Sequence, residues 1–445
     1  MSPAPHPAFS GWRICGAAVL TQAVAIGFTL GSVGVFAAPL AKDLGATATQ
    51  FNVGVSVFSL MMNLSMPFIG SQLDRGRIRG VMVAGACLLA LSLGAMSQAR
   101  TLWQVGLCFG VGCAIGMAML GPMSSSTAMA NWFSRLRGRA LGIANMGGPA
   151  GPIVIAPAAA WAIGAFGWRA TLLGFAVLVV AIGVPCVLLG ILDRPSDVGQ
   201  FPDGEAAADA AGAANASSMA SDGADPIAST LASTSGMESL LGAGPAAVAW
   251  TGGGLARCRD FWFLALAAAP FAATGIVMSA NAIPYMTQIG ASPEAAALVV
   301  VPQSIGAVAG PVVFGALADR IHPRLLFVGL IAALCAGLCG LVLEPSYAVA
   351  LALFTVIGIV GGSMMAVYGA LVARLFGVAA FGQVLGTAAL VGMPILFAMP
   401  LLFGAAFDAT GSYARGFFIL VGTLTVAALL FASLPSGEAR RARAA

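Results

Sequence analysis

Twelve stretches of the sequence are long, apolar and free of Asp, Glu, Lys and Arg, and they constrain the fold more than any other feature. They cover residues 14–41, 44–73, 80–99, 101–134, 140–168, 170–192, 261–293, 295–318, 325–343, 345–373, 375–407 and 416–437. A helix needs about 20 apolar residues to span the hydrocarbon core of a bilayer. The sequence therefore predicts an all-α membrane protein in which each stretch holds one transmembrane helix.

The composition supports a membrane environment. Charged residues make up 8% of the 445 residues and apolar residues 59%, and the mean hydropathy is +0.96. Soluble domains carry about 25% charged residues, so a cytosolic enzyme is excluded. The net charge of +4 is spread over the loops, which is too little to indicate a nucleic-acid partner. The expected partners are a lipid bilayer and a small-molecule substrate, and no nucleic acid.

Cysteine and histidine give no sign of a metal site or a disulfide framework. Seven of the eight cysteines lie inside apolar stretches, where a thiol usually serves as a small packing group. Cys258 is the exception and lies in a polar region. The two histidines, His6 and His322, fall in a tail and a charged loop, so no helical His and Cys spacing can build a metal site. We predict no metal and no cofactor.

Positive charges predict the orientation of the chain. If the first helix starts in the cytoplasm, 16 of the 20 Lys and Arg residues fall on the cytoplasmic side, and only Lys42, Arg100, Arg169 and Arg415 fall outside. Cytoplasmic loops carry the excess of Lys and Arg in membrane proteins. The sequence therefore predicts a multi-pass protein of the cell inner membrane, with both termini in the cytoplasm.

A polar segment separates the sixth apolar stretch from the seventh. Residues 193–258 are rich in Gly, Ala, Ser and Asp and hold few large apolar side chains. Such a segment buries too little surface to offset its ordering entropy, so we expect a disordered cytoplasmic linker. The predicted divisions are a cytoplasmic tail at 1–13, a six-helix bundle at 14–192, the linker at 193–258, a second six-helix bundle at 259–434 and a basic cytoplasmic tail at 435–445.

The two predicted bundles are related by an internal repeat. A shift of 245 residues, later 244, pairs Pro39 with Pro284, Gly45 with Gly290, Ser59 with Ser304, Asp74 with Asp319, Arg75 with Arg320, Gly142 with Gly386, Gly148 with Gly392 and Gly167 with Gly411. Duplication in parallel halves is typical of transporters that bind their substrate between the halves. The repeat therefore favours a transporter.

A repeated element follows the second helix of each half. It consists of Gly70, Leu73, Asp74 and Arg75 in the first copy and Gly315, Leu317, Asp319 and Arg320 in the second. This element resembles the loop signature of the major facilitator superfamily. The resemblance implies a fold of twelve transmembrane helices in two pseudo-symmetric halves. We expect Asp74, Arg75, Asp319 and Arg320 to act in conformational gating, because charges at a membrane face can pair with helix ends in one conformation and release them in another.

A narrower resemblance covers residues 12–190. The stretches NWFSRLRGRALGIANMGGPAGP at 131–152, FGWRATLLGF at 166–175 and SVGVF at 32–36 are similar to the monocarboxylate transporter and oxalate/formate antiporter branch of the superfamily. In the second half the likeness is less specific and rests on LFG at 375–377 and FDATGSY at 407–413. Members of this branch move small organic acids, so the resemblance implies an organic-acid substrate.

The candidate binding residues are neutral, because the twelve stretches contain no Asp, Glu, Lys, Arg or His. A charge at the centre of a bilayer costs about 3 kcal/mol and is usually kept for function. Helical periodicity places neutral polar residues in stripes. The candidates for substrate binding are Gln22, Asn52, Asn145, Asn281, Tyr285, Gln303 and Tyr368. For each stripe, hydrogen bonding between helices is the alternative.

The predicted function is secondary active transport of a small, monocarboxylate-like organic acid by alternating access. Protons or a counter-substrate would supply the energy by symport or antiport, because no nucleotide-binding loop of the Gly and Lys kind occurs. One alternative is an exporter or facilitator of a neutral or aromatic compound, which fits the uncharged core. Another is a non-transporting membrane sensor of the same fold. An enzyme is not predicted, since the sequence shows no paired carboxylates and no converging nucleophile and base.

Overall fold

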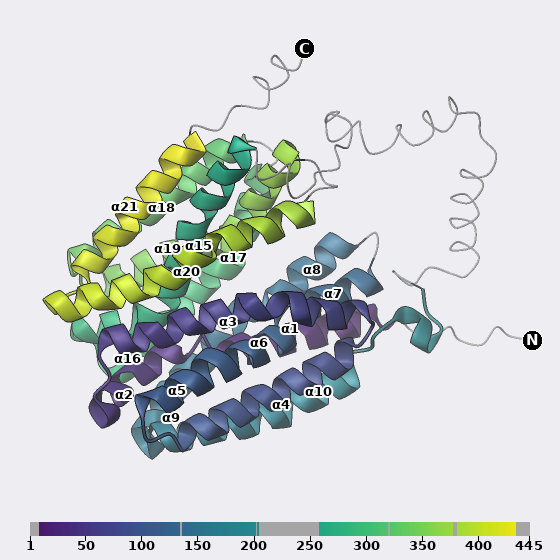
Figure 1. Cartoon of the computed structure of the whole chain (residues 1–445), viewed down its shortest axis with the longest axis horizontal. Helices are drawn as coiled ribbons and strands as arrows, with labels where there is room; N and C mark the ends of the chain where they lie inside the picture. The colour runs from purple at the N-terminus through teal and green to yellow at the C-terminus, as the bar shows by residue number, and fades with distance from the viewer. Residues whose placement is uncertain are drawn as a thin grey trace, which may run out of the picture.

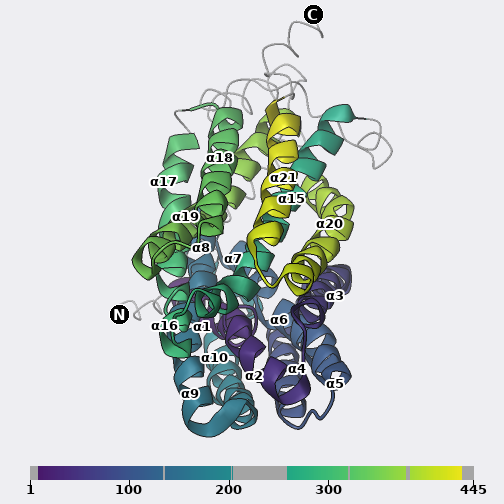
Figure 2. The same cartoon turned by 90° about the vertical axis from the view of Figure 1, so that its left-hand side faces the viewer.

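The computed structural model describes residues 9–133, 136–201, 203, 258–318, 321–376 and 381–432. Every regular element in these residues is a helix, which confirms the all-α prediction. Figure 1 shows two groups of helices, one from each half of the chain, with α3 and α20 side by side along their boundary. Figure 2 shows the two groups again after a turn of 90°.

In the described residues, the N-terminal half contains ten α-helices joined by short turns. They are α1 Gly11–Gly27, α2 Ala37–Leu44, α3 Ala48–Asp74, α4 Ile78–Ser97, α5 Leu102–Leu107, α6 Ala114–Leu120, α7 Pro122–Trp132, α8 Arg137–Asn145, α9 Gly147–Leu178 and α10 Val184–Gly190. Two π-helical segments, Cys108–Cys113 and Val179–Gly183, continue α5 into α6 and α9 into α10. Two 3₁₀ turns lie at Val33–Phe36 and Pro195–Val198.

The C-terminal half is more regular. Its helices are α15 Arg259–Gln288, α16 Pro293–Ala297, α17 Val300–Ala318, α18 Pro323–Val342, α19 Tyr347–Phe376, α20 Phe381–Thr410 and α21 Ala414–Ala432. In the described residues of this half, no π-helical segment interrupts the longer helices. The described parts of the two halves therefore differ in how often their membrane-spanning helices are interrupted.

These helices account for twelve crossings. Ten helices in the described residues are long and apolar enough to cross a membrane. One of them, Arg139–Gly190, is 52 residues long and contains Gly167 in a non-helical conformation, with φ 79° and ψ 162°. This break separates the fifth crossing from the sixth. The first crossing is made of α1 and α2, which the turn Val33–Phe36 joins, and it completes the predicted twelve.

Two pairs of glycines that the sequence repeat aligns also share a backbone conformation. Gly45 and Gly290 end the first crossing of each half with φ of 65° and 96°. Gly167 and Gly411 separate the last two crossings of each half with φ of 79° and 69°. A left-handed φ is accessible to glycine at little cost, whereas a side chain would be strained there. The sequence repeat therefore corresponds to the same turns in the two halves.

Helices α17 and α19 approach each other through four glycines: Gly306, Gly310, Gly358 and Gly362. A Cβ atom on Gly358 would lie 1.9 Å from the carbonyl oxygen of Gln303, and one on Gly362 would lie 2.2 Å from that of Ala307. Small residues allow such close backbone approach between membrane helices. These four positions fix the packing of the second and fourth crossings of the C-terminal half.

The N-terminal half uses the same device on a different pair of crossings. Here α1 and α9, from the first and fifth crossings, are in close contact. A Cβ atom on Gly147 would lie 2.1 Å from the carbonyl oxygen of Val19, and one on Gly151 would lie 2.1 Å from that of Ala23. The halves therefore share their connectivity but place their closest helix pair differently.

Replacing Gly358 or Gly362 with Ala should destabilise the protein, because overpacking a tight contact typically costs about 1–3 kcal/mol. The midpoint of thermal aggregation, measured on detergent-solubilised protein by size-exclusion chromatography, should fall for both variants. Gly361→Ala is the matched control, since a Cβ atom at Gly361 meets nothing within 4 Å. Equal midpoints for all three variants would contradict the close packing of α17 and α19.

Candidate functional site: the junction between the two halves

The junction is the contact surface between the two halves. It is formed by α3, α9 and the turn Val33–Phe36 on one side and by α15, α16, α17 and α20 on the other. We call the end of the molecule with residues 75–77 and 191–194 the linker end, and the end with residues 45–47 and 289–292 the distal end. In the described part of the chain, the main contacts of α7, α8 and α10 are within the N-terminal half.

Asn52 of α3 and Asn281 of α15 form a reciprocal amide pair across the junction. The Nδ2 atom of Asn52 donates to Oδ1 of Asn281 at 3.2 Å, and Nδ2 of Asn281 donates to Oδ1 of Asn52 at 2.9 Å. Each Nδ2 also donates to a carbonyl of its own helix, that of Ala48 or Val277, at 2.9 Å. Both side chains are buried. All amide hydrogens and both oxygens are therefore used, and the pair joins the halves in a water-poor place.

Asp408 of α20 adds a second polar contact between the halves. Its two carboxylate oxygens accept hydrogen bonds from the backbone N–H groups of Ala48 at 2.9 Å and Thr49 at 2.8 Å. The next N–H group, that of Gln50, donates to the hydroxyl of Thr47 at 3.2 Å. The first turn of a helix leaves its N–H groups without partners inside the helix. One half therefore supplies the negatively charged cap for a helix of the other, an arrangement that the helix dipole favours.

Backbone approaches close the junction beside these polar contacts. A Cβ atom on Gly34 would lie 2.8 Å from the carbonyl oxygen of Ala280, and one on Gly404 would lie 2.6 Å from that of Ala48. Glycine is required wherever two backbones come this close. We call the contacts of Asn52, Asn281, Asp408, Gly34 and Gly404 the distal clasp. These contacts hold the two halves together at the distal end.

A second amide pair forms inside the N-terminal half. Nε2 of Gln22 on α1 donates to Oδ1 of Asn145, the last residue of α8, at 3.3 Å. Gln22 is buried, but Asn145 is exposed. The helix is interrupted directly after Asn145 and resumes at Gly147. Asn145 therefore presents a carboxamide at an exposed helix end, with a buried amide supporting it.

The remaining three predicted binding residues belong to the C-terminal half. The hydroxyl of Tyr285 donates to the carbonyl of Leu341 at 2.6 Å, and its ring packs against Phe354 and Phe417. These contacts give Tyr285 a packing role within its own half. The hydroxyl of Tyr368 is buried without a hydrogen-bond partner. Gln303 is half-buried on α17.

The predicted gating residues are only partly described. Asp74 ends α3 and Arg75 follows it at the linker end, where Arg75 is exposed. The side chain of Asp74 is not described. Asp319 and Arg320 lie outside the described residues. Their role in gating stays a prediction.

Other charged residues make the contacts that the structure describes at the linker end. The guanidinium groups of Arg13 and Arg79 donate to the carbonyls of Leu189 and Leu188, in the last turn of α10. Cations are stabilised at the C-terminal end of a helix by its exposed carbonyls and its dipole. Asp193 accepts a hydrogen bond from the backbone N–H of Arg79 at 2.8 Å. Sequence reasoning missed these roles, because each bond joins residues more than 100 positions apart.

Residues at the start of the predicted linker lie against the N-terminal half. The side-chain Nδ2 of Asn131 donates to the carbonyl of Asp193 at 3.4 Å, and the backbone N–H of Ser10 donates to Oε1 of Gln200 at 3.0 Å. Residues 204–257, which make up most of the predicted linker, lie outside the described residues. Its disorder therefore stays a prediction.

The described residues offer no set of three His, Cys, Asp or Glu side chains that could hold a metal ion. The polar groups that the structure describes at the junction are amides, hydroxyls and, at the distal end, the carboxylates of Asp408 and Glu294. Such groups bind a small molecule by hydrogen bonds and can form or release contacts between the halves. Two repeated six-helix halves with a polar junction are the architecture of a membrane transporter.

Comparison with known proteins identifies the family. The sequence profile of the Major Facilitator Superfamily matches residues 19–279 and 262–445. The chain belongs to this superfamily and is one of its transporters. A bacterial homologue of the human lysosomal transporter Spinster, solved in an inward-facing and occupied conformation, is 17% identical with a TM-score of 0.68. The match covers 96% of this chain and 97% of that one. This likeness confirms the fold.

Curated relatives match one part of the chain. Mouse monocarboxylate transporter 11 is 31% identical over 186 residues, which are 42% of this chain and 40% of that protein. Human monocarboxylate transporter 1 is 28% identical over 189 residues, 42% of this chain and 36% of that protein. Riboflavin transporter MCH5 of Saccharomyces cerevisiae is 27% identical over 153 residues, 34% of this chain and 29% of that protein. The matches span less than half the length of each relative.

Replacing Asn281 with Ala should loosen the distal clasp, because Asn52 then loses its partner across the junction. Ser56→Cys, introduced into a variant without native cysteines, reports the effect, since Ser56 is buried one turn along α3 from Asn52. We expect maleimide to modify the introduced thiol several-fold faster in the Asn281→Ala background.

The matched control is Asn63→Ala. Asn63 lies on the same helix, and its Nδ2 donates to the carbonyl of Ser59 in that helix at 2.8 Å. Its removal should leave the labelling rate unchanged. An unchanged rate in Asn281→Ala, or the same increase in both variants, would contradict the clasp.

Proposed function

We propose that the protein is a secondary active transporter that moves a small organic acid across the inner membrane by alternating access. The observation that carries this proposal is the junction itself. Neutral amides from both halves meet there, in helices whose membrane-spanning stretches contain no charged residue. The names of the monocarboxylate transporter relatives support an organic acid as the substrate class.

The distal clasp is one gate of this cycle. In the conformation described, the clasp is closed, so access is from the linker end. To open the distal end, the Asn52–Asn281 pair and the two bonds of Asp408 must break. Each hydrogen bond contributes about 0.5–1.5 kcal/mol net, so breaking the four bonds costs a few kcal/mol. A substrate that binds the open state more tightly can supply this difference.

Opening the clasp also changes what the two asparagines can bind. In the closed state, all their polar atoms are used within the pair and the helices. Once the pair separates, each Nδ2 regains one hydrogen for a carboxylate oxygen. Asn52 and Asn281 would then serve as gate and as substrate contact in turn. Asn52 and Asn281 can therefore pair with each other in the closed state and still bind substrate in the open state, as the sequence predicts.

In the conformation accessible from the linker end, Asn145, Gln22 and Gln303 are the proposed substrate contacts. Asn145 is exposed and Gln22 supports it from behind, while Gln303 contributes from the other half. Tyr285 is not among the proposed substrate contacts, because its hydroxyl donates to the carbonyl of Leu341 within the C-terminal half. Neutral donors bind a carboxylate without a buried counter-charge, and affinity should be modest as a result. Protons would enter with the substrate's own carboxyl group, or a counter-substrate would leave in exchange.

An exporter or facilitator of a neutral aromatic compound is the second candidate. The absence of charge from the membrane-spanning stretches favours it, and a riboflavin transporter is among the relatives. Transport assays with neutral compounds separate this candidate from the first. A sensor of the same fold would bind a ligand without moving it.

Uptake into proteoliposomes tests the proposed substrate class. We expect purified protein to take up one or more radiolabelled short-chain monocarboxylates, and uptake should be faster when the outside pH is lower. Asn145→Ala and Gln303→Ala should each raise KM about three- to ten-fold, because one hydrogen bond to the substrate is lost. Maximal rates should change less than two-fold.

Ser279→Ala is the matched control for these variants. Ser279 is half-buried on α15, and its hydroxyl donates to the carbonyl of Gly275 in its own helix at 2.9 Å. Wild-type KM in both amide variants would remove these residues from the substrate site. Uptake of neutral aromatic compounds without any monocarboxylate uptake would favour the second candidate.

The orientation is proposed from the distribution of Lys and Arg, with the linker end in the cytoplasm. A Glu344→Cys variant in a background without native cysteines should react with a membrane-impermeant maleimide added to intact cells, because Glu344 is exposed at the distal end. Arg77 is exposed at the linker end, so Arg77→Cys should react only after the membrane is permeabilised. The reverse pattern would invert the proposed topology.

A further inference from the structure

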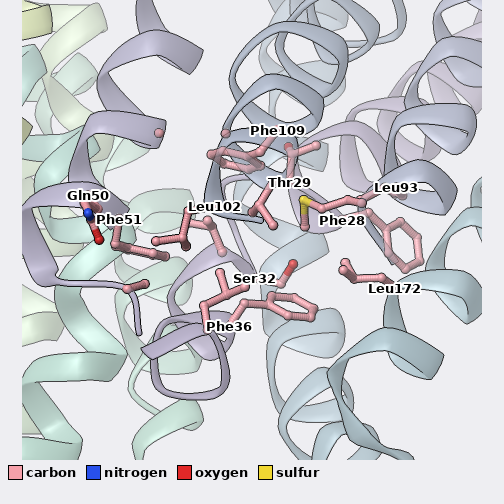
Figure 3. Close-up of a pocket in the computed structure, with 17 residues that line it drawn as sticks. Phe28, Thr29, Ser32, Phe36, Gln50, Phe51, Leu93, Leu102, Phe109 and Leu172 are labelled. Carbon is pink, nitrogen blue, oxygen red and sulfur yellow. The ribbon is translucent and has the colours of Figure 1, made fainter. Parts of the chain in front are cut away.

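The N-terminal half contains a cavity that the transport proposal does not use. It has a volume of about 60 Å³ and lies near the distal end, behind the turn Val33–Phe36 and between the ends of α3, α4 and α5. Figure 3 shows its lining, in which the rings of Phe28, Phe36 and Phe109 are prominent together with Leu93 and Leu172. None of the proposed substrate contacts lines it.

One polar group in the wall of this cavity lacks a partner. Ser32 is 1% exposed, and its hydroxyl makes no hydrogen bond to any residue that the structure describes. Its neighbour Thr29 already donates its hydroxyl to the carbonyl of Ala25 at 2.5 Å. A buried hydroxyl without a partner carries a desolvation cost of about 1–3 kcal/mol. The cavity therefore holds one hydrogen-bonding group that a ligand could satisfy.

A water molecule is a poor occupant. The volume is several times the roughly 10–15 Å³ that one water needs, but a buried water normally makes two to four hydrogen bonds. The lining includes no charged residue, and besides Thr29 and Ser32 only Gln50, which is exposed, has a polar side chain there. The cavity thus favours a group that is mostly apolar and carries a single hydrogen-bonding atom.

We propose that this cavity is a binding site for a small uncharged alcohol, in which the alkyl part packs among the phenylalanines and the hydroxyl pairs with Ser32. A hydroxyl both donates and accepts, as Ser32 does, so the two can pair in either direction. A carboxylate is excluded, because among the described lining residues only Ser32 has a buried hydroxyl without a partner, and a buried charge needs several hydrogen-bonding groups. The site is therefore distinct in chemistry and position from the junction.

The position of the cavity gives its occupant a defined effect. The turn Val33–Phe36 forms one wall, and on its other side Gly34 packs against the backbone of Ala280 in the distal clasp. An alcohol behind the turn binds the conformation described, in which the clasp is closed. A ligand that binds one conformation better shifts the population toward it, so occupancy should hold the distal end closed.

Photolabelling with a three-carbon alkanol that carries a diazirine tests the site without relying on transport, and the short chain suits the volume of the cavity. In the full-length protein in nanodiscs, we expect adducts on the peptide that contains Phe28–Phe36, and excess unlabelled propanol should suppress them. Ser32→Ala should lower this labelling at least three-fold. Gly106→Leu should abolish it, because Gly106 lines the cavity and a Cβ atom there meets nothing within 4 Å.

Gly80→Leu is the matched control for the larger side chain, since Gly80 is exposed and a Cβ atom there also meets nothing within 4 Å. It should leave the labelling unchanged. Labelling that only Gly106→Leu blocks, with no effect of Ser32→Ala, would indicate an apolar chain such as a lipid tail and would overturn the assignment. Adducts confined to exposed α3 residues such as Leu64 and Phe68, without competition by propanol, would also overturn it.

Discussion

Helices with uncharged interiors can be held together in a bilayer only by close backbone packing and neutral hydrogen bonds, because lipid provides no hydrophobic drive for helices to associate. The protein follows this constraint throughout. Glycines on α17, α19 and α9 bring neighbouring backbones into direct contact. Amide and hydroxyl side chains make polar contacts inside the membrane-spanning part, and the carboxylate of Asp408, which accepts bonds from the other half, lies exposed at the distal end.

The same constraint explains how a closed junction can still open. A buried ion pair would be expensive to separate, since each charge would be left without its partner. The Asn52–Asn281 pair is neutral, and each amide keeps a bond to its own helix after separation. Asp408 sits where water can replace its bonds to α3. The junction is thus tight enough to close a path but is made of contacts that cost only a few kcal/mol to break.

The first crossing of the N-terminal half lies between the distal clasp and the cavity. It is divided into α1, the turn Val33–Phe36 and α2, unlike its counterpart α15, which runs without a break from Arg259 to Gln288. One face of the turn belongs to the distal clasp, and the other lines the cavity. The turn interrupts the first crossing of the N-terminal half, and it places the cavity directly behind the contact between Gly34 and Ala280.

Hydropathy and the internal repeat predict the twelve crossings and the division into two halves, and the repeat pairs Gly45 with Gly290 and Gly167 with Gly411. These features depend on hydropathy and on backbone conformation within a few residues, which a single stretch of sequence records. The sequence also identified Asn52 and Asn281 as candidates, through their stripes on two helices.

The partners of those candidates depend on the tertiary structure. That Asn52 pairs with Asn281, that Asp408 caps α3 and that Ser32 faces a cavity depend on how helices hundreds of residues apart pack together. Tyr285 is a different case. Its position in a polar stripe predicts a ligand contact, but in the structure its hydroxyl donates to the carbonyl of Leu341 within the same half. Polar periodicity shows which face of a helix needs a partner, but the partner is chosen by the relative placement of the helices, which no local pattern encodes.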